Sequence, residues 1–277
     1  MPELPEVETV RRTLDEALRG REILGVAAIT WPRTIAAPAV DMFCGVLCNR
    51  QIWGVRRRAK YIIIDLDNED ALVVHLRMTG RLLVVSEDEP VDPYTRVVLI
   101  LNGSEHLRFR DVRKFGRIWL LDRAGLEQLD RQLGPEPLDP GFTAEALVNL
   151  LRGRQARLKP LLLDQRLIAG LGNIYADEAL WRAGLHPLQT AGELNDEEVA
   201  RLHAAITAVL ADAVARRGTT LSDYRDALGE MGENQNYLAV YGRQGQPCPR
   251  CGTPVERVVV AQRGTHFCPH CQPLSSS

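Results

Sequence analysis

Three features are scarce or missing in this sequence of 277 residues. No apolar run approaches the roughly 18 residues of a membrane span, which argues against a membrane-spanning helix. The first turn is acidic, the reverse of the charged beginning of a signal peptide. Excess positive charge is also missing, because the net charge is −2. These absences predict a cytoplasmic protein with no membrane partner, and the overall charge gives no support for a nucleic-acid partner.

The positive charge that is present is clustered. Residues 55–60, 108–117 and 152–159 are basic, and acidic segments beginning at Asp65 and Glu87 mask these clusters in the sum. A solvated charged face is the ordinary explanation for any one cluster. Three clusters in an acidic chain are harder to explain in that way.

The composition, 45% hydrophobic and 25% charged, is that of a globular protein with one large or two ordinary domains. From Pro5 to about Gly20, apolar residues recur at helical spacing and predict an amphipathic helix. From residue 23 to about 121 the pattern changes to short β-rich runs, interrupted by a helical segment at about 38–49. Many short strands between polar or glycine turns indicate an antiparallel sandwich or barrel.

A second region follows residues 133–142, where prolines and glycines concentrate and predict a linker between domains. Helical patterns then cover residues 143–153, 158–167, 173–184 and 196–218. The last 30 or so residues hold cysteines among short β-prone runs, and the sequence contains no internal repeat. The second region is therefore predicted to be helical, with a small cysteine-containing module at its end.

Four of the six cysteines have the spacing of a metal site. They are Cys248, Cys251, Cys268 and Cys271. Two CxxC turns facing each other across a hairpin complete a tetrahedral sulfur shell for Zn²⁺, whereas two disulfides are the less favoured alternative without a secretion signal. Four protein ligands leave no open position, so one structural zinc ion is expected. Cys44 and Cys48 are interpreted as buried apolar side chains rather than a redox pair.

Glycines precede one of the predicted helices. Gly170 and Gly172 lead into a helix that begins at Asn173. The exposed N–H groups of a helix start can bind an anion, although turn formation alone also explains such glycines. With Lys159 and the arginines before it, this segment is a candidate clamp for a DNA phosphate.

The opening stretch "MPELPEVETV" is only partly explained by a helix start. Pro5 is tolerated in the first helical turn, and Glu6 and Glu8 favour the positive end of the helix dipole. Pro2 and Glu3 precede the helix and contribute nothing obvious to it. A frayed terminus is the ordinary alternative.

Seven motifs together resemble the formamidopyrimidine-DNA glycosylase family, bacterial enzymes that remove oxidised purines. They are "PELPEVETVRR", "RRAKY", "LRMTGRL", "DVRKFGR", "GLGNIYADEAL", "VYGRQGQPCPRCG" and "QRGTHFCPHCQ", in the family's order from residue 2 to residue 272. The resemblance implies an α+β multidomain fold: an N-terminal antiparallel β-sandwich flanked by helices, then a helix–two-turn–helix domain with a zinc-finger β-hairpin. The expected boundaries are 1–132 for the catalytic sandwich, 133–146 for the linker, 147–238 for the helical DNA-binding domain and 239–277 for the zinc hairpin.

The resemblance also implies a bifunctional glycosylase and AP lyase of base excision repair. Met1 is removed, and the secondary amine of Pro2 attacks C1′ of the damaged nucleotide to form a Schiff base. The strand is then cut by β,δ-elimination. Glu3 matches the general acid/base of the family, and Glu6 matches a supporting carboxylate.

The implied partner is double-stranded DNA containing oxidised bases or abasic sites, bound by a monomer in the bacterial cytoplasm, at the nucleoid. Lys60, Asn173 and Arg263 match phosphate contacts, and Lys60 and Arg263 are included in the catalytic set because they grip the backbone flanking the lesion. Lys159 is an additional expected contact. Residues expected to fill the space of the flipped nucleotide are Met78, Arg113 and Phe115. Without the resemblance, Lys60 would be interpreted as an exposed strand residue, and Met78 and Phe115 as core.

Two alternatives remain open. One is an endonuclease VIII-like enzyme that prefers oxidised pyrimidines, against which Leu4 and the Met78, Arg113 and Phe115 set favour the purine enzyme. The other is a non-catalytic, zinc-containing protein that binds damaged DNA. Residues 222–238 fall in the family's mobile lesion-capping loop, but their middle part is a variant in which lesion contacts are not assigned to single residues.

Overall fold

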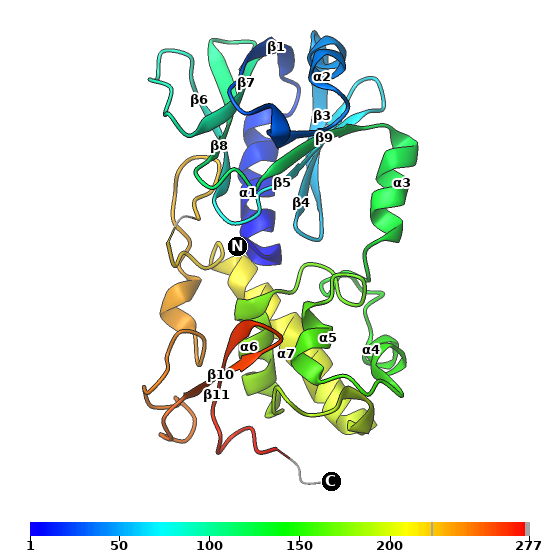
Figure 1. The fold of residues 1–277 in the computed structure, drawn as a ribbon, viewed down its shortest axis with the longest axis vertical. Coiled ribbons are helices and arrows are strands. Elements are labelled where there is room, and N and C mark those ends of the chain that lie inside the picture. The colour runs from blue at the N-terminus through cyan, green and yellow to red at the C-terminus, as the bar shows by residue number, and fades with distance from the viewer. Residues whose placement is uncertain (223, 275–277) are drawn as a thin grey trace. The chain divides into compact units, whose positions relative to one another are not determined.

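The computed structural model in Figure 1 describes residues 1–222 and 224–274. Asp223, in the loop expected to cap the lesion, and residues 275–277, at the end of the expected zinc domain, lie outside the described residues. The chain divides into two compact units, the first made of Met1–Arg131 and Arg216–Gln235, the second of Gln132–Ala215 and Asn236–Ser277.

Strands dominate the first unit. In chain order they are β1 (Glu22–Ile29), β2 (Ile35–Ala37), β3 (Arg50–Arg58), β4 (Tyr61–Leu66), β5 (Ala71–His75), β6 (Gly80–Ser86), β7 (Thr95–Leu101), β8 (Glu105–Asp111) and β9 (Arg117–Leu121). Among the described residues they hydrogen-bond in the order β2-β9-β5-β4-β3-β1-β7-β8-β6, with β2–β9 as the parallel pair. Only two residue pairs join β1 to β3, so the strands form two groups that meet there. Buried side chains of both groups lie in one apolar core, as expected for a sandwich.

The helices of this unit cover the strands. They are α1 (Leu4–Leu18), α2 (Val40–Leu47) and α3 (Arg123–Arg131), with a short 3₁₀ turn, η1 (Pro32–Thr34). α1 packs on β3, β4 and β6, and Figure 1 shows it running alongside both groups of strands. Its Val7, Val10, Leu14 and Leu18 lie in the main apolar core, because their spacing places them on one face of the helix.

The second unit is mainly helical. Its elements are α4 (Ala144–Leu151), α5 (Leu158–Leu163), α6 (Asn173–Ala183), α7 (Asp196–Ala215), the 3₁₀ turn η2 (Ala191–Glu193) and the hairpin strands β10 (Glu256–Val260) and β11 (Arg263–Phe267). A further 3₁₀ turn, η3 (Asn234–Tyr237), begins at the end of the 216–235 segment. α6 packs on α7 and β11, which positions the hairpin beside this helix (Figure 1).

Most predicted elements are present, and the structure differs from the predictions in five respects. α5 ends four residues before the predicted helix 158–167 does, and α3 and β2 were not predicted. Cys48 is exposed, so the interpretation of it as a buried side chain is wrong. Residues 216–235 pack with the first unit, although they were expected in the helical domain.

Candidate functional site

The N-terminal residues are ordered and buried. Pro2 is buried, and Glu3 exposes 3% of its surface. Glu3 is the N-cap of α1, and its backbone N–H donates to Glu6 Oε2 at 2.7 Å. The frayed terminus considered above is therefore excluded, because the start of the chain is hydrogen-bonded into the first turn of α1.

Glu6 joins this start to the 216–235 segment. Its Oε1 accepts a hydrogen bond from the backbone N–H of Thr219 at 2.7 Å. Gly218 has a φ of +79°, and a Cβ there would lie 2.9 Å from Glu6 Oε1. A side chain at position 218 would therefore be strained and would also crowd Glu6. The contact is one of several that hold the segment to the first unit, since Tyr224 and Ala227 also lie in its main apolar core.

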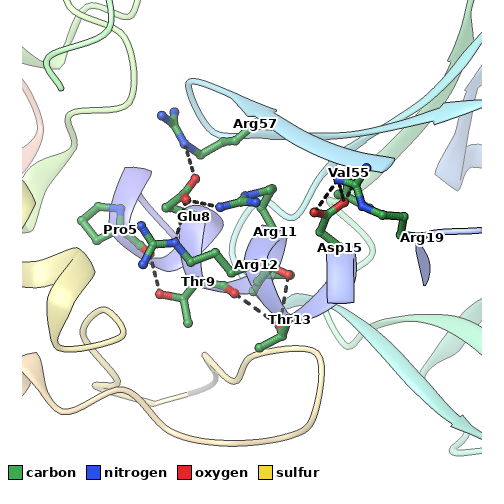
Figure 2. Close-up of polar contacts among 11 residues, drawn as sticks. Pro5, Glu8, Thr9, Arg11, Arg12, Thr13, Asp15, Arg19, Val55 and Arg57 are labelled. Carbon is green, nitrogen blue, oxygen red and sulfur yellow. Dashed lines mark hydrogen bonds and ion pairs between the residues drawn. The ribbon is translucent and has the colours of Figure 1, made fainter. Parts of the chain in front are cut away.

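A second carboxylate of α1 holds the basic strand β3, as Figure 2 shows. Glu8 Oε1 accepts from Arg11 and Arg12, and Glu8 Oε2 accepts from Arg57 Nε at 3.3 Å. Burial raises the pKa of the Glu8 carboxyl, but the three guanidinium groups outweigh burial and leave its pKa below the usual value. The end of β3 that leads to Lys60 is thereby fixed to α1.

Lys60 and His75 are both buried, and Lys60 lies close enough to His75 for its charge to act on the imidazole. Lys60 lies between β3 and β4 and exposes 5% of its surface, so it is not the exposed strand residue of the alternative interpretation. His75, at the end of β5, accepts a hydrogen bond at Nδ1 from the backbone N–H of Arg77. Burial, with the charges of Arg77 and Lys60, lowers the pKa of His75 to about 3. His75 is therefore a neutral imidazole beside a lysine that was predicted to hold a phosphate.

The three residues expected to replace a flipped nucleotide lie on two turns that are hydrogen-bonded together. Asp111 accepts from the Thr79 hydroxyl and from the backbone N–H groups of Arg113 and Gly116. Met78 and Phe115 expose 38% and 49% of their surfaces, so neither is a core residue. The Arg113 guanidinium lies 4.9 Å from the centroid of the Phe115 ring, within the range of a cation–π contact. Exposed apolar side chains on turns that are held in place by hydrogen bonds are suited to fill the space left by a flipped nucleotide.

The four predicted zinc ligands converge. The sulfur atoms of Cys248, Cys251, Cys268 and Cys271 all lie within 4.8 Å of one another. The Cys248–Cys271 and Cys251–Cys268 sulfur distances are 3.9 and 3.4 Å, close to the roughly 3.8 Å edge of a tetrahedron with Zn–S bonds of about 2.3 Å. None of the four is in a disulfide. The donor set fits one structural zinc ion, and no ligand position is left for water.

Asn173 and Arg263 come together in the second unit, whereas Lys159 does not join them at the surface. Asn173 Nδ2 donates to the backbone oxygen of Gly264 at 3.0 Å, and Gly264 directly follows the exposed Arg263. Lys159 has no exposed surface and forms an ion pair with the buried Asp177. The expectation that Lys159 contacts DNA is therefore wrong, because α6 and β11 enclose its ammonium group.

Sequence reasoning missed two buried polar residues of these sites. His75 ends a strongly apolar run and gave no signal of its own, but its place next to Lys60 follows from the β4–β5 pairing of Tyr61 with His75. Asp177 lies four residues after Asn173, so the two share a helix face. Because Asn173 contacts the hairpin, this spacing could have predicted that Asp177 also lies beside the hairpin.

Matches to known families cover most of the chain. The formamidopyrimidine-DNA glycosylase N-terminal domain matches residues 1–118, the H2TH domain of the same enzymes matches residues 133–225, and the zinc finger found in FPG and IleRS matches residues 245–274.

Relatives that match almost the whole length of the chain carry the same family name. Formamidopyrimidine-DNA glycosylases of Herpetosiphon aurantiacus and Moorella thermoacetica are each 53% identical to this chain, over 98% and 93% of it and 100% and 94% of the relatives. A mutant of the Lactococcus lactis enzyme, bound to DNA containing Fapy-dG, has a TM-score of 0.93 at 37% identity, covering 98% of this chain and 100% of that one. MutM bound to carbocyclic 8-oxo-G DNA has a TM-score of 0.92 at 37% identity, with the same coverage.

The chain belongs to the formamidopyrimidine-DNA glycosylase family. It is a DNA glycosylase with AP lyase activity that acts in base excision repair, so a non-catalytic DNA-binding protein is not favoured. The resemblance, the fold class and the zinc site inferred from the sequence are confirmed. No helix among the described residues has the length and apolar character needed to cross a bilayer.

Proposed function

We propose that this chain excises oxidised purines, 8-oxoguanine and formamidopyrimidines, from duplex DNA and then cuts the strand at the abasic site. The observation that carries the proposal is the buried Pro2–Glu3 pair at the start of α1, held by Glu6 against Thr219. A proline and a carboxylate in this position supply a nucleophile and a proton carrier once Met1 has been removed.

In the proposed reaction, the Pro2 amine attacks C1′ and gives up its proton, while the damaged base leaves with the electrons of the C1′–N bond and takes up a proton. The C1′–O4′ bond then breaks, O4′ takes a proton from Glu3, and an iminium remains between Pro2 and the opened sugar. The iminium acidifies the C2′ protons, so the 3′ phosphate leaves, followed by the 5′ phosphate. Glu3 moves protons at the sugar ring. Glu6 serves as a positioning group, because its two oxygens accept from backbone N–H groups on either side of the site.

Binding is assigned to residues from both units. Lys60, Asn173 and Arg263 contact phosphates flanking the lesion, and this grip has no sequence preference. Met78, Arg113 and Phe115 occupy the space of the flipped nucleotide. The zinc ion, held by Cys248, Cys251, Cys268 and Cys271, supplies structural support to the hairpin that carries Arg263.

We further propose that the enzyme acts as a monomer on damaged DNA in the bacterial cytoplasm, at the nucleoid. Its functional parts follow the expected boundaries: 1–132 for catalysis, 133–146 as linker, 147–238 for DNA binding and 239–277 for the zinc hairpin. Within the third part, residues 216–235 are assigned to the catalytic part instead, because they pack with the first unit.

A substrate panel tests this proposal. Purified protein is assayed on duplexes carrying 8-oxoguanine, a formamidopyrimidine, thymine glycol or uracil, with an N-terminally extended variant as the matched control. The two purine lesions should be removed fastest, and the extension should abolish removal because it converts the Pro2 amine to an amide. Faster removal of thymine glycol would favour the endonuclease VIII-like alternative. That outcome has to be tested directly, because the Lactococcus lactis enzyme has also been captured with DNA containing an oxidised pyrimidine.

A further inference from the structure

The outer edge of β11 is held by side chains rather than by another strand. β11 pairs with β10 along one edge, from Glu256↔Phe267 to Val260↔Arg263. On its other edge, the carbonyl of Gly264 and the N–H of His266 face α6 and are hydrogen-bonded by side chains of the second unit. Backbone groups on an edge strand need such partners once they are removed from water.

Three side chains make these bonds. Asn173 Nδ2 and Lys159 Nζ both donate to the Gly264 oxygen, at 3.0 and 3.3 Å. Asp177 Oδ2 accepts from the His266 N–H at 2.8 Å. The edge of β11 is thus bonded at two alternate residues, which fixes its register along α6.

The Lys159–Asp177 ion pair keeps these side chains in place. Both side chains have no exposed surface. A buried charge that loses its partner is strongly unfavourable, so each member holds the other where it also bonds β11. Removing one member leaves the other charged and enclosed, which the local structure relieves by moving the hairpin away.

The next residue of α6 anchors the start of the zinc module. Glu178 is buried and accepts hydrogen bonds from the backbone N–H groups of Ala239, Val240 and Tyr241, at 2.8, 2.9 and 2.8 Å. Consecutive acidic residues of one helix therefore hold the chain at two places: residues 239–241, before the first pair of cysteines, and His266, just before the second pair.

We propose that Lys159 and Asp177 are positioning residues, which seat β11 on α6 so that the adjacent Arg263 is presented to a DNA phosphate. Lys159 acts through the hairpin and makes no DNA contact of its own. The proposal rests on the proposed function, since that function supplies the Arg263–phosphate contact.

The test compares Lys159→Met with the double variant Lys159→Met/Asp177→Asn in the full-length, zinc-loaded protein. The first readout is hydrogen exchange of the His266 amide, and the second is the Kd for a duplex containing an abasic-site analogue. Asp212→Asn, which removes a carboxylate from an exposed ion pair of the same unit, is the matched control. Lys159→Gln replaces Lys159→Met if the latter does not fold.

Lys159→Met should speed exchange at His266 and raise Kd by about tenfold, the equivalent of one charge-assisted hydrogen bond. The double variant should recover most of both, because the neutral amide side chain that replaces Asp177 still offers an oxygen to His266. Equal loss of binding in both variants, with His266 exchange unchanged, would overturn the proposal and make Lys159 a direct DNA contact. An unchanged Kd for Arg263→Gln would instead overturn the Arg263 contact of the proposed function, whatever the exchange data show.

Discussion

At the scale of single residues, the carboxylates of Glu3 and Glu6 at the start of α1 have different proposed roles. Glu6 accepts hydrogen bonds from the backbone N–H groups of Glu3 and Thr219 and is the proposed positioning group, whereas Glu3, next to the Pro2 amine in the sequence, is the proposed proton carrier. Glu3→Gln should lower base excision by about 10²- to 10⁴-fold, the usual contribution of a general acid or base. Some cleavage of a preformed abasic site should remain, because no glycosidic bond is left to break there. Single-turnover assays on both substrates check this, with the exposed Glu16→Gln as control; equal loss on both substrates would contradict the assignment.

His75 makes a prediction about pH. Burial and the nearby charges of Arg77 and Lys60 lower its pKa from 6.5 to about 3 in the folded protein. Between these values the unfolded chain binds a proton that the folded protein does not. The His75 contribution to stability is therefore complete above pH 6.5 and is lost as pH falls, by about 1.4 kcal/mol per pH unit. NMR should show a neutral His75 imidazole throughout pH 5–8, and a titration midpoint near 6.5 would contradict the buried, cationic surroundings.

At the level of elements, the zinc hairpin depends on its metal. The module has a small apolar cluster in which Cys248 and Cys268 themselves are members, so it lacks a core that could fold without zinc. Chelation or Cys248→Ser should withdraw Arg263 and weaken DNA binding. Metal analysis together with Kd measurement checks this, with Cys44→Ser, in the first unit, as control. Full binding by protein without stoichiometric zinc would show that the cysteine cluster has another role.

The elements also show what the sequence could predict. α1 was found because its apolar residues follow the helical period, and strands such as β4 and β7 were found because they are short apolar runs rich in Val, Ile and Leu. α3 was missed because none of its residues is fully buried, and β2 because it has only three residues. Lys159 was misplaced because lysine is almost always exposed unless it is paired, and its partner Asp177 lies 18 residues away. Contacts such as Glu6–Thr219, 213 residues apart, have no local pattern at all.

For the whole molecule, a net charge of −2 conceals a locally cationic site. Lys60 and Arg77 lie beside the buried His75, and Arg57, three residues before Lys60, lies beside Glu8. The proposed DNA binding depends on this local potential rather than on the net charge. Lys60→Ala should weaken binding to damaged and undamaged duplexes alike and reduce the slope of log K against log salt by about one unit. Titrations at several salt concentrations check this, and a loss confined to damaged DNA would place Lys60 in the base pocket.

The proposed mechanism depends on one covalent bond between the chain and its substrate. Pro2 is buried at the start of α1, beside Glu3 and within a site tied to residues 216–235. The most direct measurement is borohydride reduction during turnover on DNA containing 8-oxoguanine, followed by peptide mapping of the trapped complex and mass spectrometry of the intact protein. The proposed mechanism predicts a protein without Met1 and an adduct on Pro2. An adduct on an internal lysine such as Lys60, or normal excision by a protein that retains Met1, would contradict it.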